Sequence, residues 1–132
     1  PNSRIVTDPR VVAIPHLGAS SPESERNCAV MAAQELKDYL ENGNIRNSVN
    51  LPAAVMERGG AARVCVIHRN VPSVLASITT VLSQQGLNIE NLTNKSAKEY
   101  AYTMVDVDGT VSPDTASALQ NLENVIRVRV LP

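Results

Sequence analysis

Three hydrogen-bonding side chains lie at the two ends of one predicted helix, and their types suit the binding of a small polar ligand. His68 and Asn70 end an apolar strand pattern, and a helix pattern begins at Pro72. That helix closes at Gly86, and Asn88 lies just past it. Side-chain amides both donate and accept hydrogen bonds, so they suit an ammonium group and a carboxylate together. Because strand ends and helix starts gather polar groups without breaking a core, the pattern favours sensing over bond-making chemistry.

Each of these three residues also has an ordinary structural interpretation. An asparagine near a helix start often caps the helix, and an asparagine after a glycine often lies in a turn. A histidine at a strand end is often simply exposed. Residue types alone therefore leave both interpretations open, ligand binding and plain turn chemistry.

The bulk composition excludes several classes of function. The chain has 132 residues, enough for one compact domain or for a small domain with an appendage. Its net charge of −1 offers no basic field to attract nucleic acid or anionic lipid. No apolar run approaches the roughly 20 residues that span a bilayer, and no signal peptide is visible. We therefore expect a soluble cytoplasmic protein with no nucleic-acid or membrane partner.

The core must be built from aliphatic side chains. Hydrophobic residues make up 43% of the chain but aromatic residues only 2%, with no Trp and no Phe. Cys28 and Cys65 are far apart, lack CxxC spacing and lie in apolar-periodic segments, which favours reduced core thiols. The chain begins at Pro1 without a methionine, so we expect it to be the tail of a longer protein.

The first part of the chain predicts one strand and one helix. Residues 10–15 form a short continuous apolar run, which is typical of a buried parallel strand. A loop follows, and Ser21-Pro22 then provides an N-cap with a proline at the first helical position. Apolar residues recur at helical spacing to about Leu40, and Gly43 ends the helix.

The middle of the chain has the composition of a linker. Residues 44–60 contain three asparagines, a proline and a glycine pair, which predicts weak structure. We place a domain boundary between about residues 51 and 60. This divides the chain into residues 1–50, a linker at 51–61 and a domain at 62–132.

The domain at 62–132 alternates between strand and helix patterns. Period-two alternation and helical spacing follow one another, with turn residues between them. The predicted elements are a strand at 62–69, a helix at 72–85, strands at about 88–96 and 100–107, a helix from 113 and a strand at 125–131. This βαββαβ order predicts an α+β, ferredoxin-like fold with a four-stranded antiparallel sheet and both helices on one face.

One strand of this domain carries unusual side chains for an exposed face. Covering only one face of the sheet leaves the other open, yet Tyr100, Tyr102 and Met104 alternate along one strand. The second face, or a sheet edge, is therefore predicted not to be fully polar. Pairing with another subunit would relieve that exposure.

The remaining charged residues receive ordinary interpretations. Arg127 and Arg129 are predicted to lie on a solvated strand face. Asp106 and Asp108 precede a glycine and fit strand-end turn chemistry, because no further carboxylates follow at the spacing of a calcium loop. No metal site is predicted.

Two separate stretches resemble one family of enzymes. Residues 12–20 read Val-Ala-Ile-Pro-His-Leu-Gly-Ala-Ser, the helix ends Tyr-Leu-Glu-Asn-Gly, and residues 47–52 read Asn-Ser-Val-Asn-Leu-Pro. This combination resembles the end of the catalytic portion of D-2-hydroxyacid dehydrogenases, and its last motif resembles the D-3-phosphoglycerate dehydrogenases in particular. Residues 62–132 resemble an ACT domain, the amino-acid-binding module that closes many such enzymes. Residues 1–50 would then be the remnant of the catalytic region.

The resemblance implies a role in catalysis for the first loop. His16 matches the general acid–base of the family, which exchanges a proton while hydride passes between NAD and a 2-hydroxy acid. His16, Leu17, Gly18 and Ala19 would border the nicotinamide of that cofactor. The partner carboxylate and the substrate-binding arginine would lie upstream of Pro1, and no GxGxxG fingerprint occurs here. We therefore expect the chain by itself to be inactive.

The resemblance also implies an effector site. His68, Asn70 and Asn88 match the positions that hold the effector amino acid in serine-sensitive relatives, so L-serine is the expected ligand. The family loop has a glycine where this chain has Ser73. Because glycine lets a ligand approach the backbone closely, a serine there either narrows the pocket or adds a hydroxyl contact. The first outcome would leave a domain that only assembles subunits.

Together these features predict the function of the parent protein. We expect the regulatory carboxy-terminal part of an NAD-dependent D-3-phosphoglycerate dehydrogenase, which oxidises 3-phosphoglycerate to 3-phosphohydroxypyruvate in the first step of L-serine biosynthesis. Its ACT domains would pair sheet edges in a homo-oligomer, at least a dimer, with effector sites at the seam. The alternative is an ACT domain that serves only oligomerisation and binds no ligand.

Overall fold

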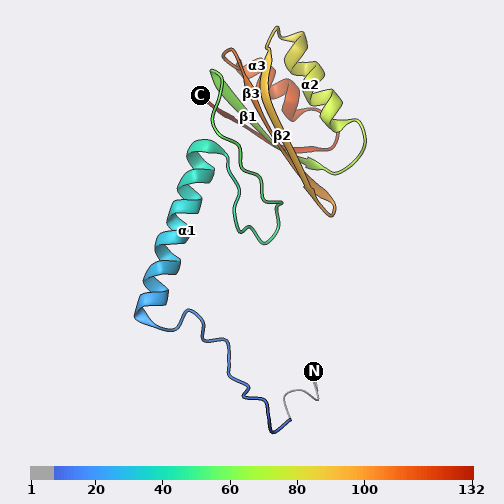
Figure 1. The fold of residues 1–132 in the computed structure, drawn as a ribbon. Helices are drawn as coiled ribbons and strands as arrows, with labels where there is room; N and C mark the ends of the chain where they lie inside the picture. The colour runs from blue at the N-terminus through green and yellow to red at the C-terminus, as the bar shows by residue number, and fades with distance from the viewer. Residues whose placement is uncertain (1–7) are drawn as a thin grey trace. The chain divides into compact units, whose positions relative to one another are not determined.

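The computed structural model describes residues 8–132, which form two compact units (Figure 1). The first unit ends at Gln34 and the second runs from Glu35 to Pro132. Helix α1 (Pro22–Asn42) begins in the first unit and ends in the second. All other helices and strands belong to the second unit.

Helix α1 begins and ends as its sequence predicts. The Ser21 hydroxyl accepts a hydrogen bond from the Ser24 N–H at 3.2 Å, which satisfies one of the free donors of the first turn. The helix stops before Gly43, whose φ of +75° favours glycine. A β-carbon there would also lie 2.5 Å from the Cys65 Sγ atom. Both the conformation and the close approach therefore require glycine at this position.

The strand predicted at residues 10–15 is wrong. These residues are irregular, and Val12 and Ile14 are 89% and 74% exposed. A strand needs a neighbour to satisfy its peptide groups, and no strand among residues 8–132 pairs with this stretch. An apolar run alone does not supply that neighbour.

The second unit confirms the predicted α+β order and sheet. All three strand pairings are antiparallel, and the spatial order is β2-β3-β1-β4. The elements are β1 (Ala62–Arg69), α2 (Val74–Gln84), β2 (Ile89–Ala97), β3 (Tyr100–Val107), α3 (Pro113–Gln120) and β4 (Val125–Leu131). Helices α2 and α3 cover one face of the sheet (Figure 1).

The main core lies between that face and the two helices. Val64 and Val66 of β1 pack against Ile78 and Leu82 of α2 and Leu119 of α3, and all five are fully buried. Their spacing follows the periods of two and 3.6 residues expected for a strand and a helix. Burying such aliphatic side chains contributes about 1.5–3 kcal/mol each, so this layer is the main source of the domain's stability.

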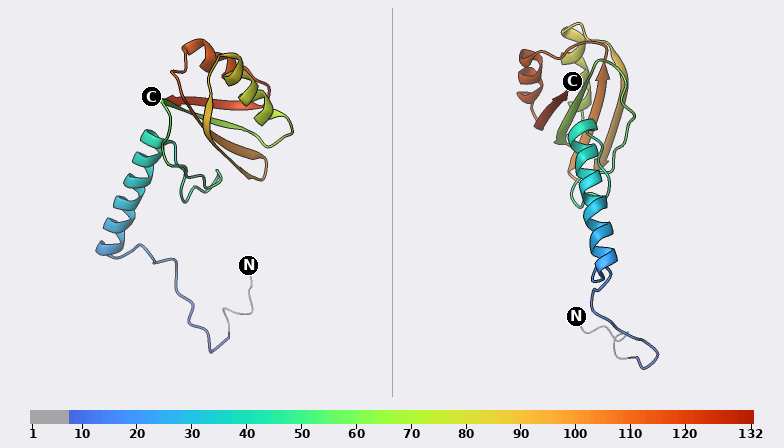
Figure 2. Two further views of the ribbon diagram at one scale, coloured as in Figure 1. Left: turned by 45° about the horizontal axis from the view of Figure 1, so that its top comes forward. Right: turned by 90° about the vertical axis from the view of Figure 1, so that its left-hand side faces the viewer.

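The other face of the sheet is covered by the segment predicted to be a linker. We call residues 43–58 the strap; Figure 2 shows it on the side of the sheet opposite α2 and α3. Ile45 and Ala54 form an isolated antiparallel bridge with hydrogen bonds of 2.8 and 3.0 Å. Both are buried together with Met56. The expectation of weak structure is therefore wrong for this segment, because spaced apolar side chains anchor it despite its asparagines and proline.

The strap also corrects the expectation of an exposed second face. Tyr102 and Met104 are 1% and 0% exposed, and they pack with Cys65 and Leu131 against the strap. No second subunit is needed to cover these side chains. Another subunit could still pair with an edge strand of the sheet.

A buried ion pair joins the strap to the sheet. Arg63 of β1 and Asp106 of β3 are both 0% exposed, with Nε and Nη2 of the arginine 2.6 and 2.8 Å from the two carboxylate oxygens. The other N–H groups of Arg63 donate to the main-chain oxygens of Asn42, Met56 and Glu57 at 2.7–2.8 Å. All five guanidinium donors are thus used. The prediction of a turn role for Asp106 is wrong, because its carboxylate points into the protein as the partner of Arg63.

Side chains of the second unit also hold the carboxyl end of α1. A helix leaves its last carbonyl groups without intrahelical partners, and cations stabilise that end. The donor–acceptor pairs are Arg129 with Tyr39 and Leu40 (3.2 and 2.8 Å), Arg58 with Glu41 (3.1 Å), Arg63 with Asn42 (2.8 Å) and Tyr102 with Gly43 (2.6 Å). Arg129 also lies 4.6 Å from the centre of the Tyr39 ring. The prediction of a merely solvated Arg129 is therefore wrong.

Candidate ligand-binding site

His68 lies inside the protein rather than on its surface. The side chain is on the helix-covered face of the sheet and the residue is only 3% exposed. Its Nδ1 atom lies 2.8 Å from the Arg69 main-chain oxygen, and its Nε2 atom lies 2.8 Å from the Thr103 hydroxyl. A carbonyl oxygen only accepts, so Nδ1 must carry a proton. Both ring nitrogens are therefore engaged within the chain.

Thr103, which is buried, and Asn94, which is exposed on β2, extend this hydrogen-bonded cluster. The Thr103 hydroxyl lies 3.1 Å from the Asn94 side-chain oxygen as well as 2.8 Å from His68. A hydroxyl has one proton, so two arrangements satisfy every group. In one, an imidazolium donates to Thr103, which donates to Asn94. In the other, the Asn94 amide group is turned to donate to Thr103, which donates to a neutral imidazole. The sequence analysis predicted neither partner of this cluster. The one available signal was Thr103, a hydroxyl side chain on the apolar side of β3.

Asn70 is tied to the turn between β2 and β3. It is exposed; its side-chain nitrogen donates to the Lys98 oxygen at 3.1 Å, and its main-chain N–H donates to the Glu99 oxygen at 2.8 Å. Among the described residues no donor reaches its side-chain oxygen. Asn70 thus presents a hydrogen-bond acceptor near the end of β2.

Asn88 lies at the opposite end of the sheet. Its main-chain N–H and oxygen bond to Asp108 at 2.9 and 3.1 Å, just beyond the point where Val107 pairs with Ala62 at the start of β1. His68 is at the other end of β1, roughly 20 Å away at the usual rise of a strand. A single chain therefore brings His68 near Asn70 but leaves Asn88 far from both.

The start of α2 is strained where the family loop has glycine. The helix begins at Val74, after the predicted Pro72, and Ser73 has φ +73° and ψ −15° in the left-handed region. The Ser73 side chain makes no capping hydrogen bond. Serine thus occupies a conformation that glycine adopts without steric cost.

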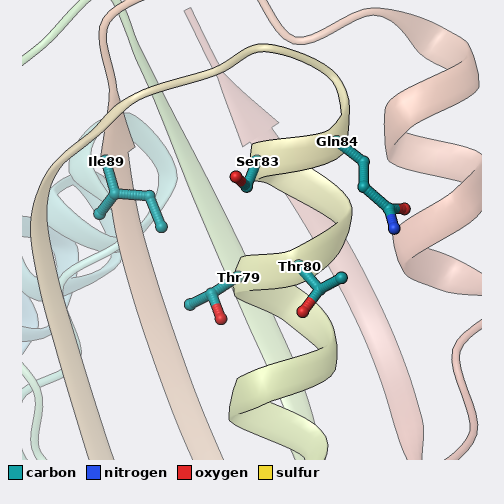
Figure 3. A pocket seen from close by; sticks show the side chains of 5 residues that line it. All are labelled: Thr79, Thr80, Ser83, Gln84 and Ile89. Carbon is teal, nitrogen blue, oxygen red and sulfur yellow. The ribbon is translucent and has the colours of Figure 1, made fainter.

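The three predicted effector residues line neither of two hollows found among the described residues of the second unit. One, of about 440 Å³, lies where α2 meets the start of β2 (Figure 3). The other, of about 350 Å³, lies between residues 48–51 of the strap and the turn that joins β2 to β3. The first is lined by Thr79, Thr80, Ser83, Gln84 and Ile89.

The predicted cofactor loop is an exposed turn in the first unit. The Ser20 N–H donates to the Leu17 oxygen at 3.0 Å, and Leu17 is 54% exposed. His16, Gly18 and Ala19 are also exposed. These residues alone do not enclose NAD, because all four are exposed and no atom lies within 4 Å of a β-carbon placed on Gly18.

Other kinds of site receive no support from the described residues. Over residues 8–132, no three His, Cys, Asp or Glu side chains gather in a way that would hold a metal ion. No helix in that same range has the length and apolar character to cross a membrane. Both cysteines are free; Cys65 is buried as predicted, and burial raises the pKa of its thiol. Cys28 is exposed on α1, so its prediction as a core thiol is wrong.

Comparison with known proteins decides the family. A family model described as an AHAS small subunit-like ACT domain matches residues 64–129. The chain belongs to this family of ACT domains. The matched residues begin within β1 and end within β4, so the ACT domain coincides with the βαββαβ part of the second unit.

The ACT domain and the segment before it both have relatives among curated proteins. D-3-phosphoglycerate dehydrogenase of Escherichia coli K12 is 29% identical over 123 residues, which are 92% of this chain and 30% of that protein. D-3-phosphoglycerate dehydrogenase 1 of Saccharomyces cerevisiae is 31% identical over 137 residues, 98% of this chain and 29% of that protein. The resemblance to the carboxy-terminal part of these enzymes is confirmed. The chain spans less than a third of their length.

The structural comparison gives weaker similarity. The ligand-free regulatory subunit of aspartate kinase from Thermus thermophilus is 14% identical, with a TM-score of 0.48 over 61% of this chain and 56% of that one.

Proposed function

We propose that the chain is the regulatory carboxy-terminal part of an NAD-dependent D-3-phosphoglycerate dehydrogenase that acts in the cytoplasm. The likeness to enzymes of that name over 92–98% of the chain supports this proposal. In the whole enzyme His16 would act as general acid–base, and His16 to Ala19 would border the nicotinamide. NAD would supply the hydride acceptor there. The ACT domain would bind a small amino acid, L-serine, as a feedback effector of serine synthesis.

One observation supports a particular place for such a ligand. Asn88 lies at the opposite end of β2 from the Lys98–Glu99 turn that holds Asn70. An isologous dimer formed at the β2 edge runs its two β2 strands antiparallel. The start of one β2 then lies beside the end of the other. Asn88 of one copy thereby meets His68 and Asn70 of the second, and a twofold dimer has two such sites.

The β2 edge has the properties that such a seam requires. It is one of the two outer strands of the sheet, nine residues long, and most of its residues are exposed. An open edge offers a row of unpaired peptide groups to another strand. The free side-chain oxygen of Asn70 suits an ammonium group, and the Asn88 amide suits a carboxylate. His68 would bond to the ligand only after one of its internal hydrogen bonds is broken.

The internal hydrogen bonds of His68 also support a second candidate function. Because both ring nitrogens of His68 are already bonded and Ser73 carries a β-carbon where the family has glycine, the domain is also suited to assembly alone. In that case the β2 seam would hold subunits together without a ligand.

Titration calorimetry of the chain against the common L-amino acids tests the proposal. We expect saturable binding of L-serine, and a loss of affinity of tenfold or more in His68→Ala and Asn88→Ala. Asn27→Ala, an exposed asparagine on α1, is the matched control and should bind as the wild type does. No heat with any amino acid at millimolar concentration would remove ligand binding and leave the assembly function.

Mixing two inactive variants tests the seam itself. Asn70→Ala and Asn88→Ala dimers should each fail to bind, because every site lacks one asparagine. After subunit exchange a mixed dimer has one doubly damaged site and one intact site, so about a quarter of all sites should recover at equal mixing. No recovery after verified exchange would show that the site does not lie across the seam.

A further inference from the structure

The two edge strands of the sheet differ in whether side chains of the same chain bond to their outer peptide groups. β4 is the outer strand opposite β2, and β1 is its partner on the inner side. On β4, the Ile126 oxygen accepts a hydrogen bond from the Gln120 Nε2 atom at 3.1 Å, and the Val128 N–H donates to the Gln120 Oε1 atom at 2.9 Å. Gln120 is the last residue of α3. One side chain thus satisfies two peptide groups of the β4 edge.

These two groups are among those that an added strand would use. Peptide groups that do not face the neighbouring strand remain free at an edge and pair readily with another chain. An amide side chain has one donor and one acceptor on the same carbon, so it satisfies an N–H and a C=O two residues apart. At the end of the same strand, Arg58 donates to the Pro132 oxygen. Two peptide groups of the β4 edge, and the Pro132 oxygen that follows the strand, are therefore already bonded within the chain.

The sequence of β4 explains why such protection matters. Val125, Ile126, Val128 and Val130 give it high β-propensity, and Ile126 is 47% exposed. Charged side chains normally discourage pairing at an edge, but Arg129 is directed toward Tyr39 and Leu40, which leaves Arg127 as the exposed charged side chain of β4. An unprotected β4 would thus be an attractive template for a second copy of the chain.

We infer that Gln120 guards the β4 edge and restricts self-association of the domain to the β2 edge. The inference rests on the β2 seam of the proposed function. Two open edges on one sheet would allow β2–β2 and β4–β4 contacts to alternate, and two different twofold contacts generate an open-ended assembly. One open edge gives a closed dimer. The Gln120 side chain thus limits assembly to the dimer, because it prevents a further copy of this chain from pairing with β4.

Sedimentation velocity over a hundredfold range of protein concentration tests the inference. Gln120→Met keeps the volume and the helical preference of the side chain but removes both polar groups. We expect the wild type to remain dimeric across the range, and at least a tenfold larger fraction of Gln120→Met to sediment as species larger than the dimer. Gln34→Ala, an exposed glutamine on α1, should match the wild type.

The outcomes separate the two proposals. A folded Gln120→Met protein with the wild-type sedimentation profile would overturn the guard. Should that variant fail to fold, Gln120→Ala decides by the same comparison, and slow amide exchange at Val128 in the wild type provides an independent measure of the hydrogen bond from its N–H to Gln120. A monomeric wild type would refute the β2 seam; a concentration-dependent dimer of Gln120→Met in that case would still support the guard.

Discussion

Replacement of Ser73 by glycine should stabilise the domain. Ser73 is exposed, has φ +73° and makes no side-chain cap, so the change removes no buried surface and no hydrogen bond of that side chain. The left-handed conformation costs an L-residue roughly 1–2 kcal/mol. Glycine gives back about 0.4–1 kcal/mol through the larger entropy of the unfolded chain. The free energy of unfolding should therefore rise by about 0.5–1 kcal/mol, which raises Tm by about 2–8 °C for a domain of this size.

The other end of the same helix offers a mirror control. Gly86 follows α2 with the same φ of +73°, and a β-carbon there would meet no atom within 4 Å. Gly86→Ser should therefore destabilise the domain by about the amount that Ser73→Gly stabilises it. Ser73→Ala keeps the β-carbon and should bring no gain. Guanidinium unfolding of the wild type and the three variants at one pH measures all four free energies.

The same comparison states what would refute the reasoning. If Gly86→Ser is destabilising while Ser73→Gly leaves the free energy of unfolding unchanged or lower, then left-handed strain is not what limits position 73. Calorimetry of Ser73→Gly with L-serine adds a functional result, since removal of the β-carbon should tighten binding if the ligand approaches the backbone at this loop.

Two further predictions concern the buried polar groups. Arg63→Met should destabilise the domain by about 3–5 kcal/mol in guanidinium unfolding, because it leaves the Asp106 carboxylate buried without its partner; Arg58→Met, at an exposed site, should cost under about 1 kcal/mol. Burial raises the pKa of Tyr102 well above its ordinary value of 10.0, so the folded state favours the neutral phenol and its stabilisation, complete below about pH 10, is lost as the pH rises further. Tyr102→Phe should therefore flatten the decline of unfolding free energy above about pH 10, and a decline identical to that of the wild type would contradict this assignment.

The sequence predicted those parts of the fold that depend on local periodicity. Val64 and Val66 alternate along β1, and Ile78 and Leu82 recur along α2, so both elements and their buried faces followed from spacing alone. The strap did not, because its buried residues Pro52, Ala54 and Met56 alternate with Ala53 and Val55, which are exposed but also apolar. The sequence therefore shows no apolar–polar alternation, and contact with the sheet decides which of these side chains are buried. The burial of the strap is a tertiary property that no local pattern encodes.

The candidate site shows a different limit of sequence reasoning. Polar residues at the two ends of one helix suggested that their side chains meet at one ligand. Helix α2, however, has 11 residues and spans about 16 Å, so its two ends are too far apart to contact one small ligand. The sequence analysis also did not pair His68 with Thr103, because the two residues lie 35 positions apart and meet only in the folded sheet. The sequence analysis made no prediction for Arg63, whose acceptors in the strap are supplied only by the tertiary fold.

The buried Arg63–Asp106 pair has a practical consequence for excising the module. A version begun at Ala62, just before the first residue of the family match, would strip the strap from the sheet. It would expose Tyr102 and Met104 to water. It would also leave three N–H donors of the Arg63 guanidinium without their carbonyl acceptors. The shortest autonomous folding unit therefore starts near Glu35, and limited proteolysis should leave a resistant core with that boundary.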